Sequence, residues 1–96
     1  MNIKLEKKEL IHFVGIGGIG MSGLALIMKG KGFNVQGSDI SNNKNIERLR
    51  KEKIKVFIGH KKQNIEKGTI LVVSSAIKKI MQSFLLPKKN NYLYIK

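Results

Sequence analysis

A glycine-rich turn between an apolar segment and a helical segment is the feature that most constrains how this chain can fold. Its residues, Gly15-Ile16-Gly17-Gly18-Ile19-Gly20, fit the pattern G-x-G-x-x-G. The apolar, β-branched run Leu10–Val14 leads straight into the turn and predicts a buried strand. Apolar residues at helical spacing follow over Ile19–Lys29. The order of strand, glycine turn and helix indicates a phosphate-binding turn; the alternative is a turn kept glycine-rich for packing alone.

The phosphate interpretation gives the residues of this turn distinct roles. Gly15 permits the tight turn, Gly17 leaves room for a pyrophosphate beside the backbone, and Gly20 lets the helix pack closely on the sheet. Gly18 and Ile19 open the helix, where free backbone N–H groups and the positive end of the helix dipole attract anions.

The remaining sequence alternates strands with helices. Strands are expected over Phe33–Gln36, Lys55–Ile58 and Thr69–Val73, and a helix from caps at Ser41–Asn43 to about Lys53. The 96 residues therefore predict a single small α/β domain with a Rossmann-like parallel sheet and helices on both faces. Ligands of such folds bind beyond the carboxyl ends of the strands.

Polar residues follow three of the strands at that edge. Ser38 and Asp39 follow the second strand. Asp39 lies about 20 residues after the turn, where dinucleotide-binding folds place an acid that accepts from a ribose. Asp39 could instead cap the turn or helix that follows it. His60 is either a nucleotide contact or an exposed loop residue, and the small residues Ser74-Ser75-Ala76 suit a phosphate or a sugar. His12, inside the first strand, is interpreted as structural.

The net charge of +13 raises the question of a polyanionic partner. Lysines are scattered along the chain, which carries only two arginines, four phenylalanines and two tyrosines. Because no basic cluster with stacking aromatics precedes the tail, no specific nucleic acid is expected. The absence of cysteine excludes thiolate metal sites. No apolar run reaches the roughly 20 residues that cross a bilayer, so a cytoplasmic protein without membrane insertion is expected.

Several segments of the sequence resemble those of one protein family. His12–Ala25, which reads HFVGIGGIGMSGLA, resembles the opening of the UDP-N-acetylmuramate–L-alanine ligases, a group within the Mur ligase family. Later landmarks keep their order and spacing over residues 10–79: Gly37-Ser38-Asp39, Ile58-Gly59-His60, Asn64 and Val72–Ile77.

This resemblance implies an N-terminal domain that holds the UDP end of UDP-N-acetylmuramate, with the glycine turn around the pyrophosphate instead of NAD. The family uses ATP and Mg²⁺ to join L-alanine to this substrate in peptidoglycan synthesis. A P-loop of the Gly-Thr-His-Gly-Lys-Thr type does not occur in the sequence. The 96 residues are therefore expected to hold no catalytic residue, metal or cofactor and not to ligate alone. The alternative is a small module that binds NAD or an adenine nucleotide.

The tail departs from the family pattern. We divide the chain into a UDP-sugar-binding domain, residues 1–79, and a basic tail, residues 80–96, that could add a helix and a last strand. Read one base earlier, possible codons of Ile80–Leu86 yield Asp-Asn-Ala-Glu-Leu-Leu-Ala, and those of Asn91–Lys96 yield Gln-Leu-Pro-Ile-Tyr-Lys, both family-like. We hypothesise a one-base deletion near the Lys78-Lys79 codons, which sequencing of the locus would test.

Overall fold

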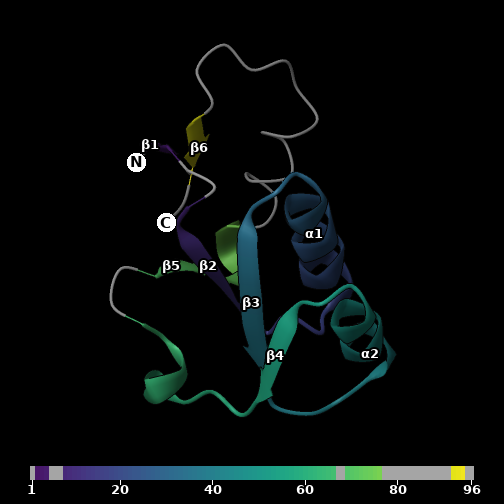
Figure 1. Ribbon diagram of the computed structural model, residues 1–96. Helices are drawn as coiled ribbons and strands as arrows, with labels where there is room; N and C mark the ends of the chain where they lie inside the picture. The colour runs from purple at the N-terminus through teal and green to yellow at the C-terminus, as the bar shows by residue number, and fades with distance from the viewer. Residues whose placement is uncertain (1, 5–7, 67–68, 77–91, 95–96) are drawn as a thin grey trace.

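Two α-helices and a parallel sheet form the main body of the computed structural model, which describes residues 2–4, 8–66, 69–76 and 92–94 (Figure 1). Its elements run β2 (Leu10–Val14), α1 (Ile19–Gly30), β3 (Asn34–Asp39), α2 (Lys44–Lys51), β4 (Lys55–Ile58), the 3-10 helix η1 (Lys62–Asn64), β5 (Ile70–Val72) and the 3-10 helix η2 (Ser74–Ala76). A separate antiparallel pair joins β1 (Asn2–Lys4) to β6 (Tyr92–Tyr94). The predicted helix of the tail lies outside the described residues.

The sheet has the strand order β4-β3-β2-β5, and every neighbouring pair is parallel. The register sets Phe13 opposite Gly37 on β3 and opposite Val72 on β5. Because the strands run in one direction, their carboxyl ends share one edge of the sheet. The predicted α/β fold with a parallel sheet is confirmed.

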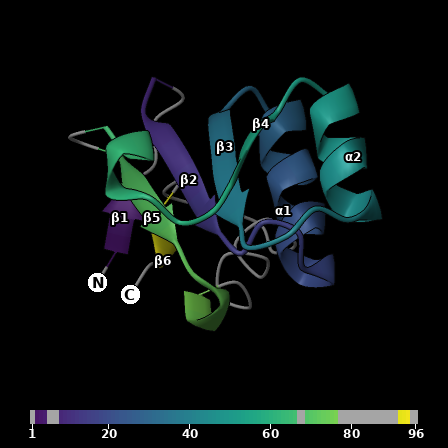
Figure 2. The same ribbon diagram turned by 90° about the horizontal axis from the view of Figure 1, so that it is seen from below.

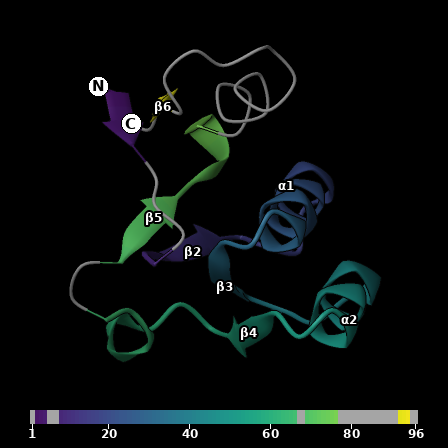
Figure 3. The same cartoon turned by 45° about the horizontal axis from the view of Figure 1, so that its top comes forward.

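Helices were predicted on both faces of this sheet, but both described α-helices lie on the same face (Figures 2 and 3). Paired residues of a sheet point to one side, and Ile11, Val35 and Ile70 are such a set. They pack in or against one hydrophobic cluster that also holds the buried residues of α1 and α2. The other face carries the side chains of His12, Gln36 and Ser38, and there the Asn64 carbonyl of η1 accepts a hydrogen bond from Gln36.

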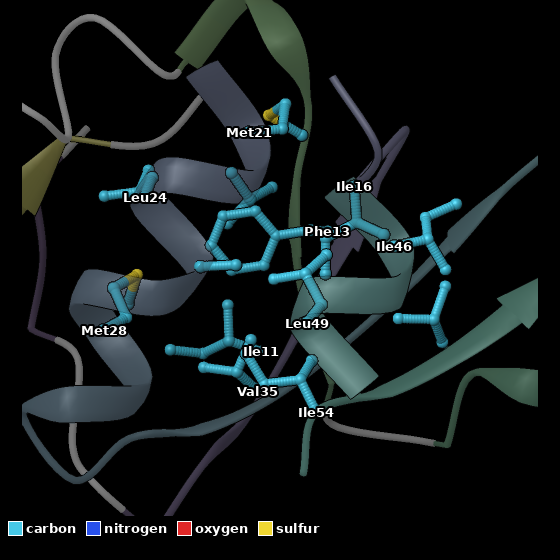
Figure 4. Packing of buried hydrophobic residues seen from close by; sticks show 13 residues of the cluster. Ile11, Phe13, Ile16, Met21, Leu24, Met28, Val35, Ile46, Leu49 and Ile54 are labelled. Atoms are coloured by element: carbon cyan, nitrogen blue, oxygen red, sulfur yellow. The ribbon is translucent and has the colours of Figure 1, made fainter. Parts of the chain in front are cut away.

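The core between the helices and the sheet consists of buried apolar side chains. Phe13 is fully buried, and Figure 4 shows it amid side chains that come from both helices. Burying one such side chain contributes roughly 1.5–3 kcal/mol relative to exposure. The cluster consists of Ile11, Phe13, Ile16, Met21, Leu24, Ala25, Met28, Val35, Ile46, Leu49, Ile54, Val56 and Val72. Within the described ranges, no helix is long and apolar enough to cross a membrane.

The two α-helices end in the same way with different residues. After α1, Gly32 has φ +94°, and the Phe33 N–H donates to the Met28 carbonyl at 3.1 Å. After α2, Lys53 has the left-handed backbone conformation with φ 64°, and the Ile54 N–H donates to the Leu49 carbonyl at 3.0 Å. The prediction that α1 ends at glycine is confirmed. At the end of α2 the left-handed residue has a Cβ, which makes this backbone conformation unfavourable.

Candidate functional site

The glycine turn is held by the end of β3. Gly15 has φ +80°, as expected for the residue that turns the chain out of β2. The N–H groups of Gly15 and Ile16 both donate to the Ser38 carbonyl, at 2.8 and 3.0 Å. The Gly18 N–H then donates to the Gly15 carbonyl at 3.2 Å. The turn therefore has a fixed shape that depends on its neighbour strand.

Gly37 on β3 makes room for this turn. A Cβ at position 37 would lie 2.5 Å from Cδ1 of Ile16 and 2.8 Å from the Phe13 carbonyl oxygen. Ile16 is fully buried, so its side chain lies directly over Gly37. The sequence reading ended the strand before Gly37, but β3 runs to Asp39. A glycine within a strand pattern was the available signal of such a close backbone approach.

Hydrogen bonds with side chains hold both the N–H and the carbonyl of Gly17. Its N–H donates to Oδ2 of Asp39 at 2.8 Å. Its carbonyl accepts from Nδ2 of Asn45 at 2.9 Å and from Nδ2 of Asn43 at 3.3 Å. A Cβ at Gly17 would lie 2.7 Å from the Asp39 carboxylate, so glycine is needed here for contacts within the protein. Sequence reasoning did not foresee the asparagine contacts.

The start of α1 is open to an anion. Its N-cap, Gly18, provides no side-chain cap, and the first turn has no acidic residue. The contrast is α2, where the side chain of Asn43 accepts from the Ile46 N–H at 3.0 Å. Helix N-termini leave backbone N–H groups without helical partners, so α1 offers such donors beside the glycine turn. Gly20 is exposed, which gives it no role in close helix–sheet packing and corrects that expectation.

Asp39 caps the turn that follows β3, as the alternative interpretation expected. Its Oδ1 accepts from the Ile40 N–H at 2.8 Å, while Oδ2 accepts from Gly17. Its carbonyl accepts from the Gly59 N–H at 2.7 Å, which joins the end of β3 to the end of β4. A contact between Asp39 and a ribose stays a prediction.

Ser38 and His60 are brought together by the fold. Oγ of Ser38 lies 2.7 Å from Nδ1 of the exposed His60 and 3.1 Å from Nε2 of His12. His12 is buried within β2, as predicted, and its Nδ1 lies 2.8 Å from Nε2 of Gln36. Burial lowers the pKa of His12, and the neighbouring His60 lowers it further. Sequence reasoning gave no sign that His12 reaches His60 through Ser38.

The predicted contacts Ser74, Ser75 and Ala76 form η2, directly after β5. Because β5 runs parallel to β2, η2 follows the same edge of the sheet as the glycine turn. Ser74 and Ser75 are exposed. Across the described part of the chain, no group of three or more histidine and acidic side chains is placed to hold a metal ion.

Comparisons with known proteins point to one family. The family model described as "Mur ligase family, catalytic domain" matches residues 10–96. A UDP-N-acetylmuramate–L-alanine ligase of Pelagibacter ubique is 73% identical over 78 residues, which cover 81% of this chain and 17% of that protein. One from Bartonella bacilliformis is 48% identical over 87 residues, 91% of this chain and 18% of the relative.

A solved structure shows the same fold. The crystal structure of the UDP-N-acetylmuramate–alanine ligase from Thermotoga maritima matches with a TM-score of 0.59 and 37% identity. The match covers 78% of this chain and 18% of that protein, so the chain spans less than a fifth of each of these relatives. From the family match, the identities and the shared fold together, we conclude that this chain belongs to the Mur ligase family.

Proposed function

We propose that the chain binds the UDP end of UDP-N-acetylmuramate at the carboxyl edge of its sheet, as the N-terminal part of a peptidoglycan ligase that acts in the cytoplasm. The substrate comes from the names of the relatives. The observation that carries the proposal is the uncapped start of α1 beside a preformed glycine turn. A pyrophosphate there would accept from the free N–H groups and lie at the positive end of the helix dipole.

The charges and polar groups around the turn suit such a ligand. The net charge of +13 favours the approach of a polyanion. Each carboxylate oxygen has further lone pairs, so Asp39 can accept from a ribose hydroxyl while it keeps its bonds to Gly17 and Ile40. In this proposal His60 contacts the nucleotide, and Ser74, Ser75 and Ala76 contact a phosphate or the sugar.

Two apolar side chains lie exposed beside these groups. Ile19 in the first turn of α1 is 89% exposed, and Ile40 directly after Asp39 is 75% exposed. Single exposed apolar residues are common on protein surfaces, but these two directly adjoin Gly18 and Asp39, which the proposal places at the ligand. We infer that the base or the sugar ring covers part of this surface. The sequence reading had included Ile19 only for its backbone and had not singled out Ile40.

ATP and Mg²⁺ belong to the proposed reaction of the full-length family, and we assign neither to a residue of this chain. The sequence has no P-loop, and the described residues contain no metal-binding cluster. The competing function is a small module for NAD or an adenine nucleotide, because Asp39 suits the ribose of any of these. Calorimetry with UDP-N-acetylmuramate, UDP, NAD and ATP separates the two. We expect weak binding of the uridine compounds and none detectable for NAD; tighter binding of NAD would refute the proposal.

A substitution at the helix start sharpens this test. Gly18 has φ −66° and ψ 154°, a conformation that an N-capping residue adopts, and a Cβ there would meet nothing closer than 3.6 Å. Gly18→Asp should therefore raise helix stability by a few tenths of a kcal/mol and abolish UDP binding by charge repulsion. Gly18→Asn is the matched neutral control and should bind more tightly than Gly18→Asp. Equal UDP affinity of the two variants would show that no anion lies at this helix start.

A further inference from the structure

We infer that Gln36, His12 and Ser38 form a buried positioning chain that fixes the tautomer of His60, so that His60 presents its Nε2–H to an acceptor oxygen of the nucleotide. The chain of hydrogen bonds stands on the structure alone. Only the identity of the ligand rests on the proposed function. Three of the four residues lie on strands, and their side chains are on the sheet face opposite the described α-helices.

The direction of the chain is set at Gln36. Its Nε2 lies 2.8 Å from Nδ1 of His12 and 3.0 Å from the Asn64 carbonyl oxygen. An amide nitrogen only donates and a backbone carbonyl only accepts. Rotating the amide by half a turn would set two oxygens against each other at Asn64, so this orientation is the one that hydrogen bonding allows. Nδ1 of His12 must therefore accept.

His12 passes this direction on to Ser38. Its ring is 1% exposed and stacks on Phe57, with the ring centres 6.5 Å apart. Burial, with His60 as a second cause, lowers the pKa of His12 and favours the neutral ring. A neutral imidazole with an accepting Nδ1 carries its proton on Nε2, and this nitrogen lies 3.1 Å from Oγ of Ser38. His12 donates and Ser38 accepts.

Ser38 then acts on His60. The residue is only 2% exposed, and its hydroxyl has a single proton to donate. With His12 donating to the oxygen, this proton points to Nδ1 of His60, 2.7 Å away. Nδ1 of His60 accepts, so the proton of the neutral ring is on Nε2. His60 is exposed, and Nε2 is the ring nitrogen that Ser38 does not use.

This arrangement makes His60 selective for a class of ligand atom. A neutral N–H donates to an oxygen with a free lone pair, such as a carbonyl of the base or a hydroxyl. The other tautomer would present a bare nitrogen and favour a donor instead. Buried polar groups with complete hydrogen bonds specify one arrangement; here that arrangement gives a fixed donor at the nucleotide edge.

The test is an isosteric substitution that reverses the chain. Gln36→Glu places a carboxyl oxygen between Nδ1 of His12 and the Asn64 carbonyl. A protonated carboxyl donates to Asn64 and accepts from Nδ1 of His12, and Nε2 of a neutral His12 ring must then accept from Ser38. The Ser38 oxygen then accepts from Nδ1 of His60, and the proton of His60 moves from Nε2 to Nδ1. Nitrogen-15 NMR of the ring nitrogens reads both tautomers at about pH 8.5, two units above the ordinary histidine pKa. The matched control is Gln63→Glu, which makes the same replacement at an exposed residue beside Asn64.

We expect Nε2–H on His60 in the parent chain and in Gln63→Glu, and Nδ1–H in Gln36→Glu. UDP affinity should fall about five- to tenfold in Gln36→Glu, the loss of one hydrogen bond. Should Gln36→Glu not fold, or should its His12 ring be doubly protonated, Ser38→Ala provides the second arm and should leave His60 with a mixture of both tautomers. A folded Gln36→Glu with a neutral His12 ring and unchanged His60, or one fixed tautomer in Ser38→Ala, would overturn the inference. The NMR experiment contains no ligand, so its outcome is independent of whether UDP binds.

Discussion

The same chemical change, glycine to alanine, should have opposite effects at two positions of this fold. At Gly37 the new methyl group would lie 2.5 Å from Cδ1 and 2.7 Å from Cβ of Ile16, and 2.8 Å from the Phe13 carbonyl oxygen. Two of these atoms belong to the backbone or are attached to it, and Ile16 is fully buried, so no side-chain rotation relieves the overlap. Overpacking of this kind costs about 1–3 kcal/mol, and we expect the upper half of that range.

Gly23 in the middle of α1 is the control. A Cβ there meets no atom within 4 Å, and the residue has a helical backbone. Alanine should therefore stabilise the protein by about 0.5–1 kcal/mol through its better helix propensity. The two variants should differ by roughly 2.5–4 kcal/mol in the free energy of unfolding, measured by urea titration. For a domain of this size, 1 kcal/mol shifts Tm by about 4–8 °C.

The Gly37 variant should also lose UDP affinity, because its methyl group pushes Ile16 and with it the glycine turn. A free energy of unfolding for Gly37→Ala within about 0.5 kcal/mol of the parent value, the range of ordinary surface substitutions, would refute the close contact between Gly37 and Ile16. A destabilised but folded variant with unchanged UDP affinity would instead separate the contact from the site.

Four further outcomes are expected. Asn43→Ala should lower stability by about 1 kcal/mol, the usual loss of an N-cap, and weaken UDP binding because the Gly17 carbonyl loses a donor; urea titration and calorimetry measure both. Lys53→Gly should raise stability by about 0.5–1 kcal/mol by relieving the left-handed backbone, whereas Arg48→Gly at an exposed position in the middle of α2 should lower it by about as much. His12 has a lowered pKa in the folded protein, so the unfolded chain binds a proton first as pH falls below about 6.5, and the folded state loses stability there. The Tm of His12→Gln should therefore fall less than that of the parent chain between about pH 7.5 and 5.5, and an equal fall would contradict this. With UDP-N-acetylmuramate and L-alanine present, the chain should release no phosphate from ATP, since it has no P-loop to orient the γ-phosphate; release above a no-protein control would contradict this.

Most of the fold could be predicted from the sequence because its signals are local. The strands Leu10–Val14 and Lys55–Ile58 have the predicted bounds, and α1 starts at Ile19 as expected. The error at β3 has a physical cause. Glycine is a poor strand residue taken alone, and only the position of Ile16, more than 20 residues earlier in the chain, explains why Gly37 is inside the strand.

The candidate site was predictable as a set of residues but not as a network. The spacing of the glycines predicted the turn, and the predicted ends of the strands pointed to Asp39 and His60. Neither signal needs knowledge of side-chain contacts. Gly17 is predicted to leave room for a pyrophosphate, and the structure gives this glycine a second role, because a Cβ there would lie within 3 Å of the side chains of Asp39 and Asn43. Asn45 had no signal of its own, since its contact with the Gly17 carbonyl depends on where α2 packs.

The position of β5 in the strand order has a consequence for the route by which this chain folds. β2 and β3 are separated by one helix, so their pairing closes a short loop, whereas Phe13 meets Val72 only after most of the chain has been spanned. Loop closure costs more entropy as the loop lengthens, and non-local strand pairing is slow. The unit β2–α1–β3 should therefore form first and β5 should join late. Amide hydrogens of β5 should then exchange sooner than those of β3, and Ser74–Ala76 would reach the carboxyl edge of the sheet only in the last step of folding.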